Sequence, residues 1–382
     1  MNFTLSEEQT ILRDAIIKFA QGELNDDIQD RDRQHKFSRD LWEKCAAMGL
    51  QGLPVPAEYG GSGVDPLTAA IALEALGYGC QDSGLNFSIC AHLLACVVPI
   101  WRHGTEAQKS RLLPGLCDGS HIAVNAMTET ETGSDSFAMN TTATPCDGGY
   151  KVNGTKTFCS NGPIADVAIV YAVTDKEKGY YGGVSAFIVH KGTPGFTPGQ
   201  QFDKMGLRTS PIGELIFDDV FVPEEDIIGG VGGGSVIFTE SMDWERALLV
   251  ACHVGTMERL VESSVAHARS RKQYGQTIGK FQAVSHRIAD MKVRLQASKL
   301  LTYYAASNLG VTREVGRDAA IAKLFTSESL IQTTHDTVQI MGGYGFMTES
   351  NVERSLRDAV AGTIYSGTSE VQRNIIARWL RL

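Results

Sequence analysis

Hydrophobic residues change their spacing twice along this chain, and the changes divide it into three parts. Up to about residue 120, stretches such as "LSEEQTILRDAIIKFA" place apolar residues at the three- and four-residue steps of amphipathic helices. From 121 to 233, short β-branched and aromatic runs such as "DVAIVYAVT" are separated by Gly, Asn, Asp and Pro, which is typical of strands and turns. From 234 to 382 the helical spacing returns. The pattern predicts an α+β protein with an N-terminal helical domain (1–120), a middle β domain (121–233) and a C-terminal helical bundle (234–382).

Individual residues mark the starts and the buried faces of these elements. Ser6 and Gln9 have the spacing of a capping box, and Asp65 followed by Pro66 predicts another helix start. The regular spacing of short strands in the middle region predicts a small antiparallel barrel or sandwich. The predicted buried positions are Leu12, Ala15, Ile16 and Phe19 in the first helix, and Val284, Ile288, Met291, Leu295, Ala320, Leu324, Ile331 and Val338 in the C-terminal helices.

Composition narrows the classes of protein that fit. The 382 residues carry a formal net charge of −9 and contain no run rich in Lys and Arg, which argues against nucleic acid as a main partner. The eight cysteines include no CxxC pair, so we expect buried free thiols and no zinc site. The start "MNFTLSEEQ" lacks a secretory pattern, and no apolar run is expected to span a bilayer. These features predict a cytoplasmic protein without a membrane span.

Two segments of the middle region carry candidate cofactor chemistry. In "NAMTETETGSD", residues 125–135, the end of a predicted strand is followed by hydroxyls and a turn at Gly133. Backbone N–H groups at such a turn can meet a ring carbonyl or a phosphate, although an ordinary polar hairpin has the same pattern. In "KTFCSNGP", Phe158 offers an aromatic face and Ser160 a hydroxyl, whereas a buried strand fully accounts for Cys159.

A third candidate group lies in the C-terminal region. Arg271 carries a planar guanidinium that suits a pyrophosphate, and Gln282 follows it. The glycine-containing turn "QIMGGYG", residues 339–345, could pass close to a nucleotide. A lone arginine on a helix is usually only solvated, so the interpretation depends on these residues occurring together.

The order of the three regions, together with these motifs, resembles the acyl-CoA dehydrogenase family of flavoproteins over essentially the whole chain. The resemblance implies an N-terminal helical domain, a middle β-barrel domain and a C-terminal four-helix bundle. It also implies FAD as cofactor and a homo-oligomer, most often a tetramer, in which Arg271, Gln282 and the 339–343 turn reach the FAD of a neighbouring subunit. The FAD-contacting residues that it implies are Asn125, Ala126, Met127, Thr128, Gly133, Ser134, Phe158, Ser160, Arg271, Gln282, Gln339, Ile340, Gly342, Gly343, Thr368, Ser369 and Glu370.

The position of the catalytic base is the point at which this chain departs from many family members. They carry a Glu in the sequence "YEGT", whereas this chain has "YSGT", with Ser366 at that position. A minority of the family, including isovaleryl-CoA dehydrogenase, places the base within a pattern of Asp, any residue, Glu and Arg. That pattern is present here as "DWER", residues 243–246, and Glu245 falls on the base position.

The surroundings of Glu245 in the sequence favour this assignment. The apolar run "ALLVAC" that follows would desolvate the carboxylate and raise its pKa. Taken alone, Glu245 would be interpreted as a favourable charge in the first turn of a helix. Together with the missing carboxylate at Ser366, it is predicted to be the catalytic base. The resemblance places the substrate beside Ser134, Asp243, Trp244, Arg246, Ser366 and Gly367.

Two classes of thioester substrate remain open within this family. The segments "GLNFSICAHLLACVVPIWRHG", "SNGPIADVAIVYA", "MDWER" and "YSGT" are similar to a subgroup that oxidises a prolyl group on a carrier protein in natural-product biosynthesis. The alternative is a short or branched acyl-CoA. A relative that binds FAD without catalysis and a flavin monooxygenase also remain possible interpretations. The electron acceptor, oxygen or electron-transfer flavoprotein, and the number of electrons removed are left open.

Overall fold

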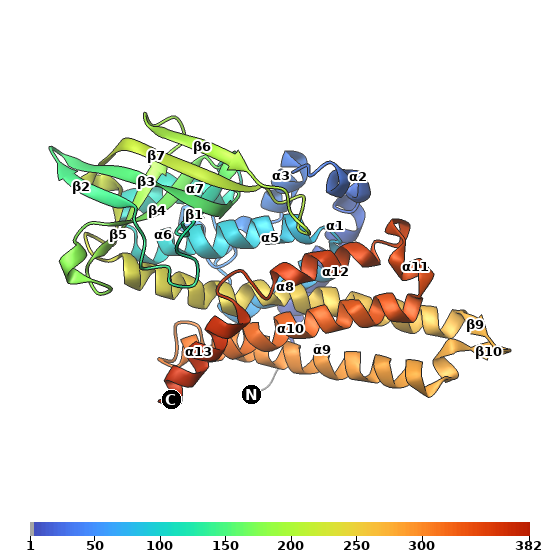
Figure 1. Ribbon diagram of the computed structural model, residues 1–382. Helices are drawn as coiled ribbons and strands as arrows, with labels where there is room; N and C mark the ends of the chain where they lie inside the picture. Colours follow the sequence, from blue (N-terminus) through green and yellow to red (C-terminus); the bar gives the residue numbers. More distant parts are fainter. Residues whose placement is uncertain (1–3) are drawn as a thin grey trace.

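The computed structural model describes residues 4–382. In it the three predicted regions, helical, β and helical, pack against one another. Figure 1 shows the sheet at one end of the molecule and the long C-terminal helices extending away from it. The α+β class and the helical, β and helical order are therefore confirmed.

The N-terminal region contains helices that pack beneath the sheet and against the first long C-terminal helix. Their bounds are α1 Glu7–Glu23, α2 Ile28–Arg33, α3 Arg39–Ala47, α4 Pro66–Gly79, α5 Ser83–His92, α6 Val98–His103 and α7 Glu106–Cys117. The capping box is confirmed, because the Ser6 hydroxyl accepts from the Gln9 N–H and the Gln9 side chain accepts from the Ser6 N–H. The Asp65 cap with Pro66 in the first turn is also confirmed. Ile16 is buried as predicted, whereas Ala15 is exposed.

The segment Ser83–His103 is long and apolar enough, by composition, to cross a membrane. The expectation that no such segment exists is therefore wrong. A π-helical stretch, Leu93–Val97, joins α5 to α6 and makes the run continuous. Within the fold, 83% of its most apolar window is buried inside the protein, so it serves as a core helix of the described structure.

The middle region forms an eight-stranded sheet within residues 4–382. Its strands are β1 Ala123–Ala126, β2 Thr142–Cys146, β3 Gly149–Ser160, β4 Val167–Val173, β5 Val184–His190, β6 Phe196–Gln201, β7 Ile212–Pro223 and β8 Ile227–Ile228. The order is β6-β7-β3-β2-β4-β5-β8, with β1 paired to β4. The expectation of purely antiparallel pairing is wrong, because β4 pairs in parallel with both β1 and β2. Parallel pairing needs a long connection, and the connection between β1 and β4 includes the whole 127–141 segment.

The C-terminal region is dominated by three long helices that pack on one another. Its elements are α8 Gly234–Ser270, the hairpin strands β9 Lys272–Gln273 and β10 Gln276–Thr277, α9 Gln282–Asn308, α10 Val315–Met341, α11 Gly343–Phe346, α12 Val352–Ala361 and α13 Ser369–Trp379. Met291 and Leu295 are buried as predicted, and so is Ala320. Leu12, Phe19, Val284, Ile288, Leu324, Ile331 and Val338 are only half-buried.

The buried face of α10 is more polar than the spacing of hydrophobic residues in the sequence predicts. Lys323, Ser327, Thr333 and Thr337 are all almost completely buried there. Lys323, Ser327 and Thr337 donate to carbonyls, as Thr337 does to the Thr333 carbonyl at 2.9 Å, and the Thr333 hydroxyl accepts from Arg294 Nε at 3.4 Å. A buried position can therefore be polar when it has a hydrogen-bond partner, and this cannot be read from hydrophobic spacing.

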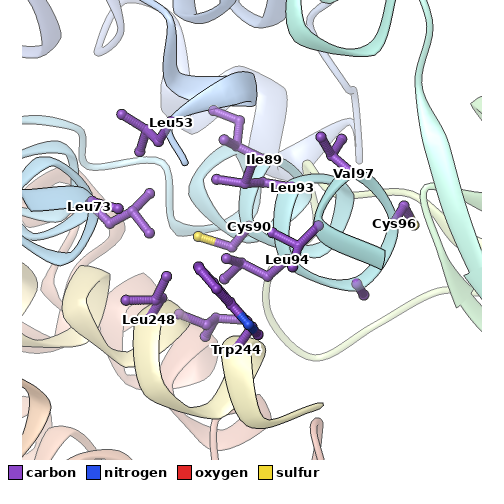
Figure 2. Packing of buried hydrophobic residues seen from close by; sticks show 14 of the residues in the cluster. Leu53, Leu73, Ile89, Cys90, Leu93, Leu94, Cys96, Val97, Trp244 and Leu248 are labelled. Carbon is purple, nitrogen blue, oxygen red and sulfur yellow. The ribbon is translucent and has the colours of Figure 1, made fainter. Parts of the chain in front are cut away.

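The start of α8 crosses the N-terminal helices in the largest core cluster. Figure 2 shows Trp244 and Leu248 of α8 lying close to Cys90 and Leu94 of the Ser83–His103 segment. Farther along α8, a Cβ added at Gly255 would lie 2.0 Å from the Glu74 carbonyl of α4. This close approach allows α8 to pack directly on α4. All eight cysteines are free, and all but the half-buried Cys146 are buried, as predicted.

Candidate active site

The carboxylate of Glu245 and the hydroxyl of Ser366 lie in direct contact. Glu245 is well inside α8, which begins at Gly234, so the alternative that it occupies the first helical turn is wrong. Its carboxylate accepts a hydrogen bond from the Ser366 hydroxyl, although 121 positions separate the two residues. Glu245 is 7% exposed. The fold therefore unites both positions at which the family pattern can place a base.

Burial and the neighbouring positive charges shift the pKa of Glu245 in opposite directions. Desolvation raises the pKa of its carboxyl above the usual range, while the Ser366 hydrogen bond and the positive charges of Arg246 and Lys323 oppose that rise. The net direction is upward. The carboxylate is thus a stronger base than a solvated glutamate, and it retains groups that support its ionised form.

The turn that carries Ser366 has an unusual backbone. Ser366 has φ +54° and Gly367 has φ +89°, both in the left-handed region. A serine there is uncommon and marks a site that its surroundings hold in place. Arg246 Nε donates to the Ser366 carbonyl at 3.0 Å, and Gln372 Nε2 donates to the same oxygen at 3.1 Å. Side chains from α8 and α13 therefore stabilise the turn directly.

The residues on either side of Glu245 have different surroundings. Asp243 lies 3.4 Å from Arg246, and burial raises the pKa of Asp243 to about 6 despite that positive charge. Trp244 is 4% exposed and packs edge-on against Trp101, with ring centroids 5.9 Å apart. Asp243 and Trp244 also border a cavity of about 320 Å³ whose other side is the 309–313 segment and Val315. The cavity opens beside Asp243 and Trp244, and Glu245 itself does not line it.

The first candidate cofactor segment runs out of the sheet into an irregular loop. Asn125 and Ala126 end β1, and Met127 is buried at 4% exposure. The Thr128 carbonyl accepts from the Thr157 N–H at 2.8 Å, which ties this segment to β3. Gly133 and Ser134 lie in the exposed loop, and a Cβ added at Gly133 would meet nothing within 4 Å. The two middle-region motifs are thus adjacent in the fold.

A buried ion pair holds this loop against the sheet. Lys156 is completely buried and its ammonium lies 3.0 Å from both the Glu129 carboxylate and the Met127 carbonyl. Glu129 also accepts from the backbone N–H groups of Asn140 and Thr141, at 2.7 and 2.8 Å. Every charged group here has several partners, as a buried pair requires. The pair closes the loop 127–141 at both of its ends.

Phe158 is turned outward by an irregularity in β3. The pairing register with β7 shifts between Lys156 and Cys159, and Phe158 has φ +51° at that bulge. Its side chain is 60% exposed, with its ring 5.4 Å from Phe202. Ser160 is the last residue of β3 and is half-buried. Bulges commonly redirect a side chain beside a functional site.

Within one chain the other predicted cofactor residues lie elsewhere. Arg271 ends α8, and its guanidinium lies 5.8 Å from the Tyr344 ring, next to the Gly342–Gly343 turn. Gln282 begins α9 and Gln339 is exposed near the end of α10, whereas Ile340 is buried. Figure 1 shows this end of the helices, near β9 and α11, far from the sheet. The chain therefore presents two separate groups of predicted FAD-contacting residues.

The "TSE" segment forms the start of α13. Thr368 caps the helix, since its hydroxyl accepts from the Val371 N–H at 3.3 Å. Ser369 is buried and its hydroxyl has no hydrogen-bond partner in the described structure, while Glu370 is exposed. These residues directly follow the Ser366–Gly367 turn.

The sequence interpretation missed Lys323 and Gln372. Lys323 donates to the Gly367 carbonyl at 2.7 Å, and Gln372 donates to the same oxygen at 2.8 Å. One signal for Lys323 was present, because it follows Ala319 and Ala320 at the four- and three-residue steps of a buried helix face. Gln372 carried no such signal.

Comparison with family models decides where this chain belongs. The acyl-CoA dehydrogenase N-terminal domain matches residues 6–120, the middle domain matches 125–220 and the C-terminal domain matches 232–381. The chain belongs to the acyl-CoA dehydrogenase family. The resemblance inferred from the sequence motifs is confirmed, and the helical, mixed-sheet and helical architecture is that of this family.

Several members of the family are similar to this chain over its full length. An L-prolyl-[peptidyl-carrier protein] dehydrogenase of a Serratia species is 43% identical over 382 residues, which cover 100% of this chain and 99% of that protein. The crystal structure of the prolyl acyl carrier protein oxidase AnaB matches with a TM-score of 0.97 and 42% identity, covering 99% of this chain and 100% of that one. A structure of PigA with FAD and proline matches with a TM-score of 0.97 and 42% identity over 100% of both chains.

Proposed function

We propose that this acyl-CoA dehydrogenase family member oxidises a prolyl thioester carried on a peptidyl or acyl carrier protein, using bound FAD. The observation that carries the proposal is the buried contact between Glu245 and Ser366, which supplies a desolvated base where the usual glutamate is missing. The full-length similarity to prolyl-carrier-protein dehydrogenases supports the substrate class.

The residues of the middle region fit FAD. Phe158 exposes an aromatic face at the β3 bulge, where an isoalloxazine ring could pack, and Ser160 follows with a hydroxyl. The loop beyond Thr128 offers backbone groups and open space around Gly133. The buried, unpartnered Ser369 hydroxyl at the start of α13 is a further polar group available to a ligand. Bound FAD would accept a hydride from the substrate at flavin N5.

Glu245 acts as the general base in this proposal. A thioester carbonyl acidifies the proton on the adjacent α-carbon, but a positioned carboxylate is still needed to remove it. Burial raises the pKa of Glu245 and so makes it more basic, while Ser366, Arg246 and Lys323 support the ionised state required before the reaction. The Ser366 hydroxyl donates to the carboxylate and thus orients it.

The shape around the base favours a compact acyl group. Ser366 and Gly367 are small, and Ser366 replaces the longer glutamate side chain that many family members have at this turn. Tyr365, which precedes Ser366, stacks on Phe87, with ring centroids 4.7 Å apart, and both residues line a pocket beside the turn. In the proposal Ser134, Asp243, Trp244, Arg246, Ser366 and Gly367 surround the substrate, and the 320 Å³ cavity beside α8 admits its phosphopantetheine arm.

The proposal includes a homo-oligomer, with a tetramer as the expected form, and a cytoplasmic location. Arg271, Gln282, Gln339 and the Gly342–Gly343 turn are exposed at the end of the helices away from the sheet. Such residues could contact FAD only in a neighbouring subunit. Sedimentation of the FAD-bound protein tests the assembly, and a monomer that retains FAD would contradict this part of the proposal.

A comparison of three substrates tests the function. Prolyl-carrier protein, prolyl-CoA and isovaleryl-CoA are each mixed anaerobically with the FAD-loaded enzyme, and flavin bleaching is followed together with the mass of the acyl group. The expected result is bleaching by the carrier-bound prolyl group with a loss of two hydrogens, and neither change with the Glu245→Gln variant. Fast bleaching by isovaleryl-CoA alone would replace the proposal with a branched-chain acyl-CoA dehydrogenase, the alternative that the position of Glu245 also permits.

A further inference from the structure

Lys323 is a buried cation without a carboxylate within ion-pair distance among the described residues. It lies on α10 at 1% exposure. Its ammonium donates to the Gly367 carbonyl at 2.7 Å and lies 6.0 Å from the centre of the Tyr365 ring. Burying a lysine is costly unless its charge is used, and here its contacts are with the backbone turn that follows Tyr365.

Three side chains from three helices hold two consecutive carbonyls of this turn. Arg246 and Gln372 bond the Ser366 oxygen at 3.0 and 3.1 Å, and Lys323 and Gln372 bond the Gly367 oxygen at 2.7 and 2.8 Å. Both carbonyls are directed toward these donors while Ser366 adopts a left-handed backbone. The same backbone conformation brings the Ser366 hydroxyl onto Glu245.

We propose that Lys323 is a positioning residue of the active site, which fixes the 365–367 turn and thereby keeps the Ser366 hydroxyl on the Glu245 carboxylate. Lys323 touches neither the substrate nor the reacting atoms in this role. Gln372 shares the hydrogen-bonding part of the role, but only Lys323 adds a charge from α10. The proposal rests on the function proposed for Glu245.

The charge of Lys323 has a separate consequence for Glu245. The ammonium favours the ionised carboxylate, and Glu245 in turn favours the charged lysine, although burial and the charge of Arg246 lower the pKa of Lys323 to about 8. The charged or titratable groups around this pair come from every neighbouring element. They are Asp243, Glu245, Arg246 and His253 on α8, Cys90 on α5, Cys96 in the π-helical stretch, Glu328 on α10, Tyr365 on the turn and Glu370 on α13. Of these neighbours, Arg246 is the cation that would remain beside Glu245 without Lys323.

Hydrogen exchange tests the positional role independently of the reaction. Backbone amides of residues 363–369 are followed by mass spectrometry in the FAD-loaded protein and in the Lys323→Met, Lys323→Gln, Lys323→Arg and Lys44→Met variants. Loss of the donor in Lys323→Met should speed exchange in this segment by about tenfold or more, because the turn opens more often. Lys323→Gln and Lys323→Arg keep a donor and should exchange more slowly than Lys323→Met. The Lys44→Met control changes a half-exposed lysine on α3, outside the turn, and should match the parent.

The pH dependence of flavin reduction tests the role of the charge. Removing the cation raises the pKa of Glu245, and the base must be ionised to act. The acidic limb of the plot of flavin-reduction rate against pH should therefore move upward by about one pH unit in Lys323→Gln. Lys323→Arg should keep the parent limb. Gln372→Met should slow flavin reduction by about tenfold to a hundredfold through misplacement, and it should move the acidic limb upward only as far as the Ser366 hydroxyl leaves Glu245. Lys323→Gln also supplies the test if Lys323→Met does not fold.

The outcomes separate this inference from the proposed function. Parent-like exchange in Lys323→Met would overturn the positional role, whatever the substrate proves to be. An unmoved acidic limb in Lys323→Gln would overturn the role of the charge. If Glu245→Gln retains full activity, the proposed base is wrong, whereas the exchange result on the 363–369 segment stands by itself. The limb is measured with whichever of the three thioesters reduces the flavin fastest.

Discussion

The Ser366 hydroxyl donates a hydrogen bond to the carboxylate of Glu245, and this contact joins the two positions at which the acyl-CoA dehydrogenase pattern can place a base. In a family member with glutamate at the turn, a carboxylate would occupy the side that Ser366 occupies here. Two ionised carboxylates in contact would repel each other, so an ionised carboxylate at one position disfavours a second one at the other. The hydroxyl is compatible with Glu245 because it donates a hydrogen bond without adding charge.

Replacing the base should remove activity and stabilise the fold. Glu245→Gln keeps the size of the side chain but not its basicity, and loss of a general base typically lowers the rate about a hundredfold to ten-thousandfold. The folded-state pKa of Glu245 is raised, so its ionisation lowers stability as pH increases from the unfolded value through the folded one. At neutral pH the variant should therefore have a higher Tm, measured by calorimetry. Retained turnover with an unchanged Tm would contradict both expectations.

Removing the Ser366 hydroxyl should shift the pH profile of the reaction. This hydroxyl lowers the pKa of Glu245 by bonding its ionised form, so Ser366→Ala should raise that pKa further. Because the base must be unprotonated, the acidic limb of kcat/KM should move to higher pH, by about one unit. Ser327→Ala is a control, since Ser327 is a buried serine on the neighbouring helix α10 whose hydroxyl bonds a carbonyl of its own helix. If the acidic limb of kcat/KM moves equally in both variants, the shift does not come from the hydrogen bond between Ser366 and Glu245.

Breaking the ion pair beneath the cofactor loop should release FAD. Lys156→Met leaves Glu129 buried without its cation, and removal of one partner of a buried pair costs about 3–5 kcal/mol. We expect a lower free energy of unfolding and less FAD retained after gel filtration, measured by visible absorbance. Lys151→Met changes a half-exposed lysine on the same strand and should retain FAD. Full FAD retention in Lys156→Met would show that the loop 127–141 does not depend on this pair.

The helix crossing that seats α8 should not tolerate a methyl group. A Cβ added at Gly255 would lie 2.0 Å from the Glu74 carbonyl and 2.5 Å from the Tyr78 backbone nitrogen. Gly255→Ala must separate α4 from α8, and we expect a loss of about 1–3 kcal/mol or more in denaturant unfolding. Gly22→Ala is the control, because nothing lies within 4 Å of its added Cβ. Its expected effect is a gain of up to about 1 kcal/mol from helix propensity. Equal stability of the two variants would refute the close crossing.

Much of the architecture follows from local sequence pattern. The three regions, the Ser6 and Asp65 helix starts and the buried thiols could be predicted because spacing, capping and composition act over a few residues. The flavin motifs and the "DWER" pattern also identified the family, since they are short and contiguous. The parallel pairing of β4 with β1 and β2 could not be predicted, because no local pattern distinguishes it from antiparallel pairing.

What the sequence by itself determined about this protein is its class, its family and the identity of a candidate base, Glu245. Only the tertiary structure decided that Ser366 bonds to that base, that Lys323 and Gln372 hold the adjacent turn, and that Phe158 is exposed at a bulge. The physical reason is that these contacts join residues from separate elements of the chain. Lys323 follows a buried helix face in the sequence, but its partner is a backbone carbonyl, and the direction of a carbonyl is set only when the turn, α8, α10 and α13 pack together.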